Sequence, residues 1–297
     1  MDSFRRGWSF LIQAWSMARK DPDLIQPSVF ALFAGFFVSL VFIPLVLVAG
    51  FLTVQESNLL GQVVLFVLSA IMIFVQFMVS YVFSAMTVYL IYGYLAEGDG
   101  RMSKAWAIVR RDFFDLLTLA AVATAVNLIK KVVEGRRQSA VRSSLANLID
   151  VVWTQAAFLI LPAMVIEDIG LKEAVRRVAN IVKNNLLLIG ISTVGVRAVN
   201  GLINFLLGAL GIGLGFSIGL GMITVTDAST FGLVAGIGLG VLVAGVVLML
   251  SAVITSYTAT AYHTCLYLWA REVEKAQEAG GGLQVQAPAP LAAVLLR

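Results

Sequence analysis

The sequence predicts an all-α integral membrane protein: a bundle of six transmembrane helices with three amphipathic helices on the cytoplasmic surface. Three observations support this fold class. The composition is very apolar, long apolar runs recur along the chain, and a short basic segment precedes each pair of runs. Apolar residues make up 60% of the chain and charged residues 13%, with a mean hydropathy of +0.93. Soluble domains carry about 25% charged residues, so this chain lies outside their range.

A basic amphipathic segment occurs three times. The first lies within residues 4–20, the second within residues 102–113 and the third within residues 171–183. The first two place a tryptophan on an apolar stripe beside basic residues and aspartates, and the third is a weaker copy without tryptophan. A helix with one apolar and one basic face lies in the plane of a membrane surface. Each copy therefore predicts a surface helix that leads into a transmembrane hairpin.

Six apolar runs reach the roughly 20 residues that a helix needs to cross a bilayer. We expect spans at about 28–51, 63–94, 113–133, 145–166, 186–222 and 231–269. We divide the chain into an interfacial helix in residues 1–27, a transmembrane domain in residues 28–270 and a flexible cytoplasmic tail in residues 271–297. Each surface helix and the hairpin that follows it form one unit, and the three units cover residues 4–95, 102–166 and 170–269. The fifth run is about 55 Å long as a helix, so it must tilt, break or project from the bilayer.

The distribution of basic residues predicts the orientation. Residues 4–20, 101–113 and 171–183 each carry four basic residues and the tail carries three, whereas the loops after the first and fifth spans carry none. Because cytoplasmic loops hold the excess of lysine and arginine, both termini and all three surface helices are expected in the cytoplasm, with the chain in the inner membrane of a cell. Residues 130–142 disagree, since their five basic residues would lie outside. The alternative is that spans three and four do not cross, which leaves four crossings.

Two series of glycines occur in the last pair of spans. Their members are four residues apart, at Gly211, Gly215 and Gly219 and at Gly232, Gly236 and Gly240. Small residues at this spacing clear one helix face, so that another helix backbone can approach closely. Two interpretations follow: the two spans pack on each other, or the glycines form a seam between protomers.

Arg197 lies about 11 residues into the fifth span, and a charge within the membrane is a functional-site hypothesis by default. Asp150 in the fourth span is its nearest partner by depth. The alternative is that the span starts late and Arg197 reaches the headgroups with its long side chain. A polar path through the bundle would consist of Arg197, Asn200, Asn204, Asp150, Thr154, Gln76 and Thr255.

The sequence does not suggest an enzyme. It contains one cysteine, Cys265, and one histidine, His263, which is too few for a cysteine-based metal site or a disulfide. No nucleophile, base and orienting acid recur at a usable spacing. We expect no cofactor and no bound metal. The basic pI near 9.3 reflects residues that flank the spans, so we expect anionic lipid headgroups rather than nucleic acid as partners.

The segment from Leu161 to Arg177 resembles a family of uncharacterised bacterial and archaeal polytopic membrane proteins. More distantly, the chain is similar to the membrane domain of some glycerophosphodiester phosphodiesterases. The positions that carry the resemblance are Pro162, Glu167, Gly170, Glu173 and Arg177. It implies a topology of about six spans and no activity. Glu173 and Arg177 are also four residues apart, which predicts an ion pair along one helix face.

Taken together, these observations predict a non-enzymatic membrane protein that self-associates, or scaffolds a membrane assembly, through its glycine-rich helices. The alternative is a channel or transporter with a polar path around Arg197 and Asp150. A third expectation concerns the tail, whose apolar end, residues 291–296, could dock on a partner after a flexible linker.

Overall fold

The computed structural model describes residues 2–55, 59–135, 153, 156–226, 229–278, 287–288 and 290–292. These residues are helical apart from short turns and contain no strand, which confirms the all-α class for the described part of the chain. The chain divides into two compact units. Unit 1 contains residues 1–17, 187–262 and 287–297, and unit 2 contains residues 18–186 and 263–286.

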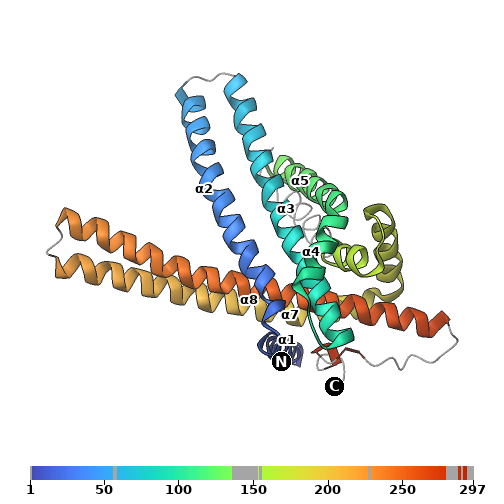
Figure 1. The fold of residues 1–297 in the computed structure, drawn as a ribbon. Helices are drawn as coiled ribbons and strands as arrows, with labels where there is room; N and C mark the ends of the chain where they lie inside the picture. Colours follow the sequence, from blue (N-terminus) through green and yellow to red (C-terminus); the bar gives the residue numbers. More distant parts are fainter. Residues whose placement is uncertain are drawn as a thin grey trace. The chain divides into compact units, whose positions relative to one another are not determined.

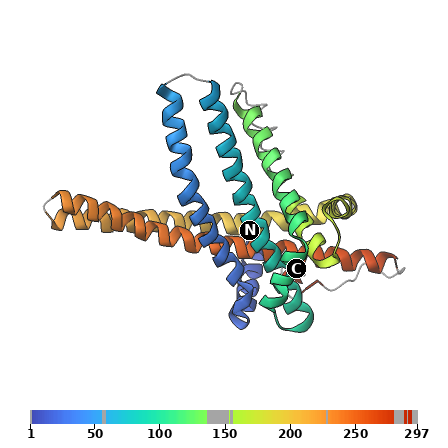
Figure 2. The same cartoon turned by 45° about the horizontal axis from the view of Figure 1, so that its top comes forward.

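Unit 2 is built on an antiparallel pair of long helices, α2 (Gln26–Gln55) and α3 (Leu59–Glu97). Figures 1 and 2 show the two side by side, with α5 (Phe113–Gly135) along the other side of α3. The short helix α4 (Met102–Arg111) precedes α5 and packs on the end of α3. The runs of α2 and α3 are apolar on all faces, which is typical of helices surrounded by lipid or by other helices.

The chain turns before α2 and after α3, at the two places where the sequence breaks its apolar pattern. Gly98 has a φ of +79°, a conformation that favours glycine, and it ends α3. Asp21 precedes the 3₁₀ turn η1 (Pro22–Leu24), and its carboxylate accepts a hydrogen bond from Asp23 N at 3.1 Å and one from Gly100 N at 2.7 Å. One carboxylate therefore joins the start of α2 to the loop after α3.

Unit 1 is built on the hairpin of α7 (Leu171–Val225) and α8 (Thr230–Glu278), whose parts within this unit run antiparallel and side by side (Figures 1 and 2). Most of α1 (Asp2–Lys20) belongs to the same unit. Aromatic side chains join α1 to α8. Phe10 meets Tyr262 edge-on with ring centroids 5.3 Å apart. The Tyr257 hydroxyl donates a hydrogen bond to Ala14 O at 2.9 Å.

Five described helices are long and apolar enough to cross a membrane: Pro22–Phe51, Leu59–Glu97, Phe113–Lys131, Ala198–Val225 and Thr230–Ala276. These helices indicate a membrane protein. The fourth predicted span, 145–166, lies partly outside the described residues. Its described end is a shorter apolar helix, Ala156–Glu167. The described part of the chain thus contains five candidate spans, which overlap five of the six predicted ones.

Three details of the predicted elements need correction. The third surface segment is not a separate helix, because α7 runs from Leu171 to Val225 and no proline interrupts it. Residues 271–278 belong to α8 rather than to a flexible tail, since Val273 is buried and holds this end of the helix in unit 2. The sequence predicts an apolar stripe on α1 that includes Trp8, Leu11, Ile12 and Trp15. The buried face is instead centred on Phe10 and Ala14, because the tyrosines of α8 pack there, and Trp8 and Ile12 are exposed.

Candidate functional site

The glycines of the last two helices face each other inside the hairpin. A side chain at Gly219 would lie 3.0 Å from Gly236 O, and one at Gly240 would lie 2.6 Å from Gly215 O. Gly211 lies against Val247 in the same way, because a Cβ added at Gly211 would lie 3.0 Å from Val247 Cβ. The distance at Gly240 leaves no room for a side chain, and at Gly219 and Gly211 a side chain would force its neighbour to move. These glycines therefore let the backbones of α7 and α8 touch within one chain.

Gly232 has a different role from the other five. A side chain there would collide with Thr226 in the turn between the helices, and its backbone N–H donates to Ser229 Oγ at 3.1 Å. Gly232 thus fits the first turn of α8 against the hairpin loop, and it does not extend the contact between the helices.

A second stripe of small residues runs along the opposite face of α7. It consists of Ala209, Gly213, Ser217 and Gly221, which are four residues apart and exposed. A Cβ added at Gly213 or Gly221 would have nothing within 4 Å. The Ser217 hydroxyl donates to Gly213 O at 2.8 Å, so its polar group is satisfied within the helix. We call these four residues the outer stripe; it is not among the glycine series that the sequence indicates.

Three residues of the predicted polar path make hydrogen bonds within their own unit. Gln76 in unit 2 donates to Gly35 O at 3.0 Å and Ser39 Oγ at 2.9 Å, which ties α3 to α2. Asn204 in unit 1 accepts from Ser251 Oγ at 2.6 Å, which ties α7 to α8. Thr255 donates within its own helix, to Ser251 O at 2.8 Å.

The remaining members of the path are only partly described. Asp150 and Thr154 lie outside the described residues, and for Arg197 the structure describes the helical backbone but not the side chain. Asn200 Oδ1 is buried and has no hydrogen-bond partner among the described residues.

A charged cluster holds together the segment that carries the family resemblance. Arg177 on α7 pairs with Glu167 at 3.1 Å and with Glu274 on α8 at 2.5 Å, and the Tyr267 hydroxyl donates to Glu167 Oε1 at 2.6 Å. Burial acts to lower the pKa of Arg177, but its hydrogen bonds and charge attraction to both glutamates outweigh this effect, so the pKa is raised above its usual value. The predicted partner Glu173 is exposed instead, because Arg177 points to the more buried carboxylates.

The turn before α7 is fixed by two aspartates. Asp168 adopts a φ of +56°, which lets the chain reverse after the helix Ala156–Glu167, and Arg111 Nη2 pairs with it at 2.9 Å. A hydrogen bond to Asp112 raises the pKa of Arg111. Asp115 on α5 accepts from Leu171 N at 3.2 Å and so caps the first turn of α7. The Gly170 and Glu167 positions of the motif therefore belong to a folded junction.

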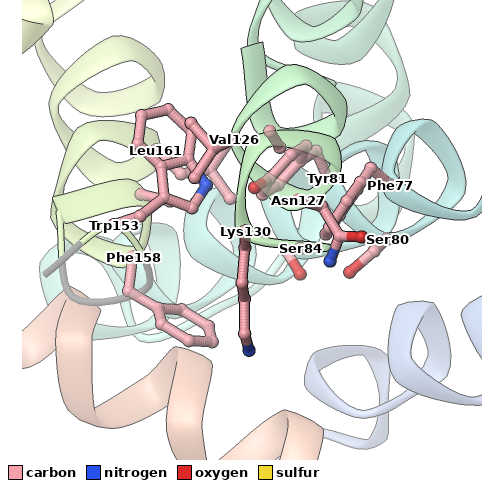
Figure 3. A pocket seen from close by; sticks show the side chains of 12 residues that line it. Phe77, Ser80, Tyr81, Ser84, Val126, Asn127, Lys130, Trp153, Phe158 and Leu161 are labelled. Carbon is pink, nitrogen blue, oxygen red and sulfur yellow. The ribbon is translucent and has the colours of Figure 1, made fainter. Parts of the chain in front are cut away.

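A cavity of about 180 Å³ lies in unit 2, between α3, α5 and the segment around the helix Ala156–Glu167. Figure 3 shows Lys130 running through the middle of the view, with Phe158 on one side and Asn127 and Ser84 on the other. Asn127 Oδ1 is buried and has no hydrogen-bond partner among the described residues. The cavity is lined by Phe77, Ser80, Tyr81, Ser84, Ala123, Val126, Asn127, Lys130, Trp153, Ala157, Phe158 and Leu161.

Comparison with known proteins places the chain in a family. Residues 59–277 match the family described as "Family of unknown function (DUF6159)". The chain belongs to this family. The DUF6159 region starts at α3 and includes the cavity, the charged cluster and both stripes of small residues, whereas α1 and α2 precede it. The match agrees with the predicted resemblance to an uncharacterised family, and nothing supports the more distant link to glycerophosphodiester phosphodiesterases. No curated protein and no solved structure matches the chain.

The sequence does not locate this cavity or identify most of its lining, for a physical reason. Its lining comes from three helices, and each contributes residues that occur singly in apolar runs, such as Asn127 and Trp153. A signal is present in the sequence, since Ser80 and Ser84 lie one turn apart on α3 and form a polar stripe. Only the packing of the helices shows that Asn127 meets that stripe.

Proposed function

We propose that this member of the DUF6159 family is a non-enzymatic, multi-pass membrane protein that self-associates and so scaffolds a membrane assembly. The observation that carries the proposal is the outer stripe of α7. Small residues at intervals of four form an exposed face with open space beside Gly213 and Gly221. Within a membrane, helices associate by close packing at such faces, because lipid offers no hydrophobic drive between them.

The proposed seam differs from the one that the sequence favours. Gly215, Gly219, Gly236 and Gly240 already contact each other between α7 and α8 of one chain, so a second chain has no access to them. Gly213 and Gly221 carry the same spacing on the other face of α7. Self-association is therefore assigned to the outer stripe, and the inner glycines serve to build the hairpin that presents it.

The proposal includes six crossings of the inner membrane, with both termini and the basic helices in the cytoplasm. The described helix Ala156–Glu167 would be the end of the fourth span. Exposed Trp8 and Ile12 on α1 and Trp106 on α4 support a position of these helices at the membrane surface, where amphipathic aromatic side chains are favoured. Anionic headgroups would meet their basic residues.

Docking of a partner on the tail is a separate proposal with less support. Leu291 is fully buried in unit 1 of its own chain, and Leu291 N donates to Pro288 O at 2.8 Å. At least the first residue of the apolar end is therefore occupied before any partner binds.

A channel or transporter is the second candidate, and one observation favours it. Asn200 Oδ1 is buried in unit 1 without a hydrogen-bond partner among the described residues, and Asn200 is three residues from Arg197. An unsatisfied acceptor in such a position would suit a polar solute or water. Flux into vesicles that is lost on Asn200→Leu, with the oligomer unchanged, would favour this candidate.

The proposal is tested by the mass of the protein in detergent micelles, measured by light scattering after gel filtration. The native chain should form a dimer or larger oligomer, and Gly213→Leu should shift it toward the monomer. Gly238→Leu is the matched control, because Gly238 on α8 is equally open but has large residues, Val234 and Leu242, one turn away on each side. A native chain that is monomeric, or an oligomer that tolerates Gly213→Leu, would refute the seam.

A further inference from the structure

Two serine hydroxyls line the cavity of unit 2. Ser80 and Ser84 lie one turn apart on α3, where Ser80 is exposed and Ser84 is half-buried. A hydroxyl group on a helix commonly donates to the carbonyl one turn earlier, as Thr87 of the same helix does to Phe83 O at 3.0 Å. Ser80 and Ser84 donate no hydrogen bond to another described residue. Their protons are therefore available to a molecule in the cavity.

The spacing of these two hydroxyls selects the group that they bind. Side chains four residues apart on a helix have Cβ atoms about 5–6 Å apart. One oxygen atom between them lies within the roughly 2.7–2.8 Å that an O–H···O hydrogen bond requires. A carbonyl oxygen has two lone pairs, so it accepts from both hydroxyls. Figure 3 shows the oxygen atoms of Ser80 and Ser84 pointing to the lower part of the view, into which Lys130 and Phe158 also extend.

The aromatic walls select the rest of the ligand. Phe77 stacks on Tyr81 with the ring planes 12° apart, and Phe158 stacks on His263 of α8, in the same unit, with centroids 4.5 Å apart. These contacts hold three of the walls in place, and flat walls favour a flat ring. An apolar cavity of about 150 Å³ takes one benzene molecule. A cavity of about 180 Å³ therefore suits one six-membered ring with a small substituent.

The place of the cavity and the charge of its lining favour a neutral ligand from the membrane. At 1.5 Å per residue, Ser80 lies about 32 Å from Leu59 and about 26 Å from Glu97, so the cavity opens on the flank of an apolar helix. Lys130 alone among the lining residues is charged, and it already makes an interaction of its own. A charged ligand would leave water without a counter-charge to receive it, which is costly.

We propose that this cavity binds the ring of a neutral, membrane-soluble molecule that carries a carbonyl group, as aromatic ketones and quinones do. Ser80 and Ser84 donate to the carbonyl oxygen, and the aromatic side chains hold the ring. The site is independent of the self-association seam, because it lies in unit 2 and the outer stripe lies in unit 1.

The test measures binding of para-fluoroacetophenone, a neutral ketone with one ring, by fluorine NMR. The full-length protein is placed in lipid nanodiscs, and empty nanodiscs give the background from ligand dissolved in the lipid. The matched ligand is para-fluoro-α-methylstyrene, in which a methylene group replaces the carbonyl oxygen. The ketone should bind about tenfold more tightly, as expected for two neutral hydrogen bonds. No binding of the ketone, or equal binding of the two compounds, would overturn the proposal.

Ser84→Ala tests the assigned hydrogen bond. It should weaken binding of the ketone about fivefold, the change that one neutral hydrogen bond supplies, and leave binding of the methylstyrene unchanged. Ser69→Ala is the matched control, since Ser69 is a half-buried serine of the same helix that does not line the cavity. Equal losses for Ser84→Ala and Ser69→Ala, or equal losses for the two compounds, contradict the role of Ser84.

Two further arms establish the place and the source of the ligand. Ser80→Leu puts a larger side chain at an exposed position of the lining, where the fold tolerates it, and should abolish binding of both compounds. Unchanged binding would place the ring elsewhere and refute the site. Para-fluorobenzoate, a charged and water-soluble analogue, should not displace the ketone at equal concentration. Displacement would show that the cavity serves a water-soluble anion, against the proposal.

Discussion

At the scale of single residues, the fold depends on a few polar side chains that join distant segments of unit 2. Arg177 joins Glu167 to Glu274, and Asp21 joins the start of α2 to Gly100. The side chains of Arg177, Glu167 and Glu274 are 28%, 19% and 21% exposed, so removal of the cation would leave two largely buried carboxylates without a charge partner. Such a loss is costlier than breaking a surface ion pair.

Arg177→Met is therefore expected to lower the free energy of unfolding by about 1–3 kcal/mol. This is less than the roughly 3–5 kcal/mol lost when one partner of a fully buried ion pair is removed, because the cluster is partly exposed. Arg101→Met is the control, because Arg101 is 52% exposed and its partner Glu97 is 53% exposed, and it should cost less than about 1 kcal/mol. Thermal unfolding in detergent, followed by circular dichroism, compares the two variants. Equal losses of stability would show that the Arg177 cluster is no stronger than a surface pair.

Asp21→Ala is expected to destabilise unit 2 by about 1–2 kcal/mol, because two backbone N–H groups, of Asp23 and Gly100, lose their acceptor. Asp99→Ala in the adjoining loop should change the stability little, since its carboxylate is 64% exposed. Protection of the Gly100 amide from hydrogen exchange provides the local measurement. Unchanged protection in Asp21→Ala would show that this hydrogen bond contributes nothing.

At the scale of helices, the sequence predicts which glycines cluster but not which face they serve. The spacing of Gly211, Gly215 and Gly219 predicts a close helix contact, and the structure has that contact with α8. The outer stripe is harder to recognise because two of its four members are Ala209 and Ser217, and a glycine pattern does not include them. Which part of the wide apolar face of α1 is buried could not be predicted either, because the tyrosines of α8 decide it.

Gly240→Ala is expected to cost about 1–3 kcal/mol, since its new methyl group would lie 2.6 Å from Gly215 O and push α7 and α8 apart. Gly238→Ala adds the same methyl group two residues away, where nothing lies within 4 Å, and it should not destabilise the hairpin. The measurement compares the melting temperatures of Gly240→Ala and Gly238→Ala in detergent. A Gly240→Ala variant as stable as Gly238→Ala would mean that the helices are not in backbone contact.

At the scale of the whole molecule, composition alone predicts the class, and five described helices of membrane-spanning length support it. The number of crossings is harder to predict, because the basic residues of 130–142 oppose the six-span topology. The continuity of α7 could not be predicted either, since the change from an amphipathic to an apolar pattern near residue 186 suggests two elements although no residue there ends a helix.

The six-span topology predicts that a cysteine at position 138 faces the outside of the cell. Gln138→Cys in a Cys265→Ser background should react with a membrane-impermeant maleimide added to intact cells, because an odd number of crossings precedes it. A cysteine at Ser103, in the cytoplasmic α4 of this topology, should react only after the cells are opened. Labelling of position 138 only in opened cells would establish the four-span alternative.

The central claim, self-association through the outer stripe, is tested most directly by disulfide formation between chains in the membrane. The background is again Cys265→Ser, because Cys265 is the only cysteine of the chain. Ser217→Cys should form a disulfide-linked dimer on mild oxidation, since the stripe places the two Ser217 positions of paired α7 helices in contact. Gly238→Cys, on an equally open face of α8, should remain monomeric. Failure of Ser217→Cys to cross-link, or equal cross-linking at both positions, would contradict the account.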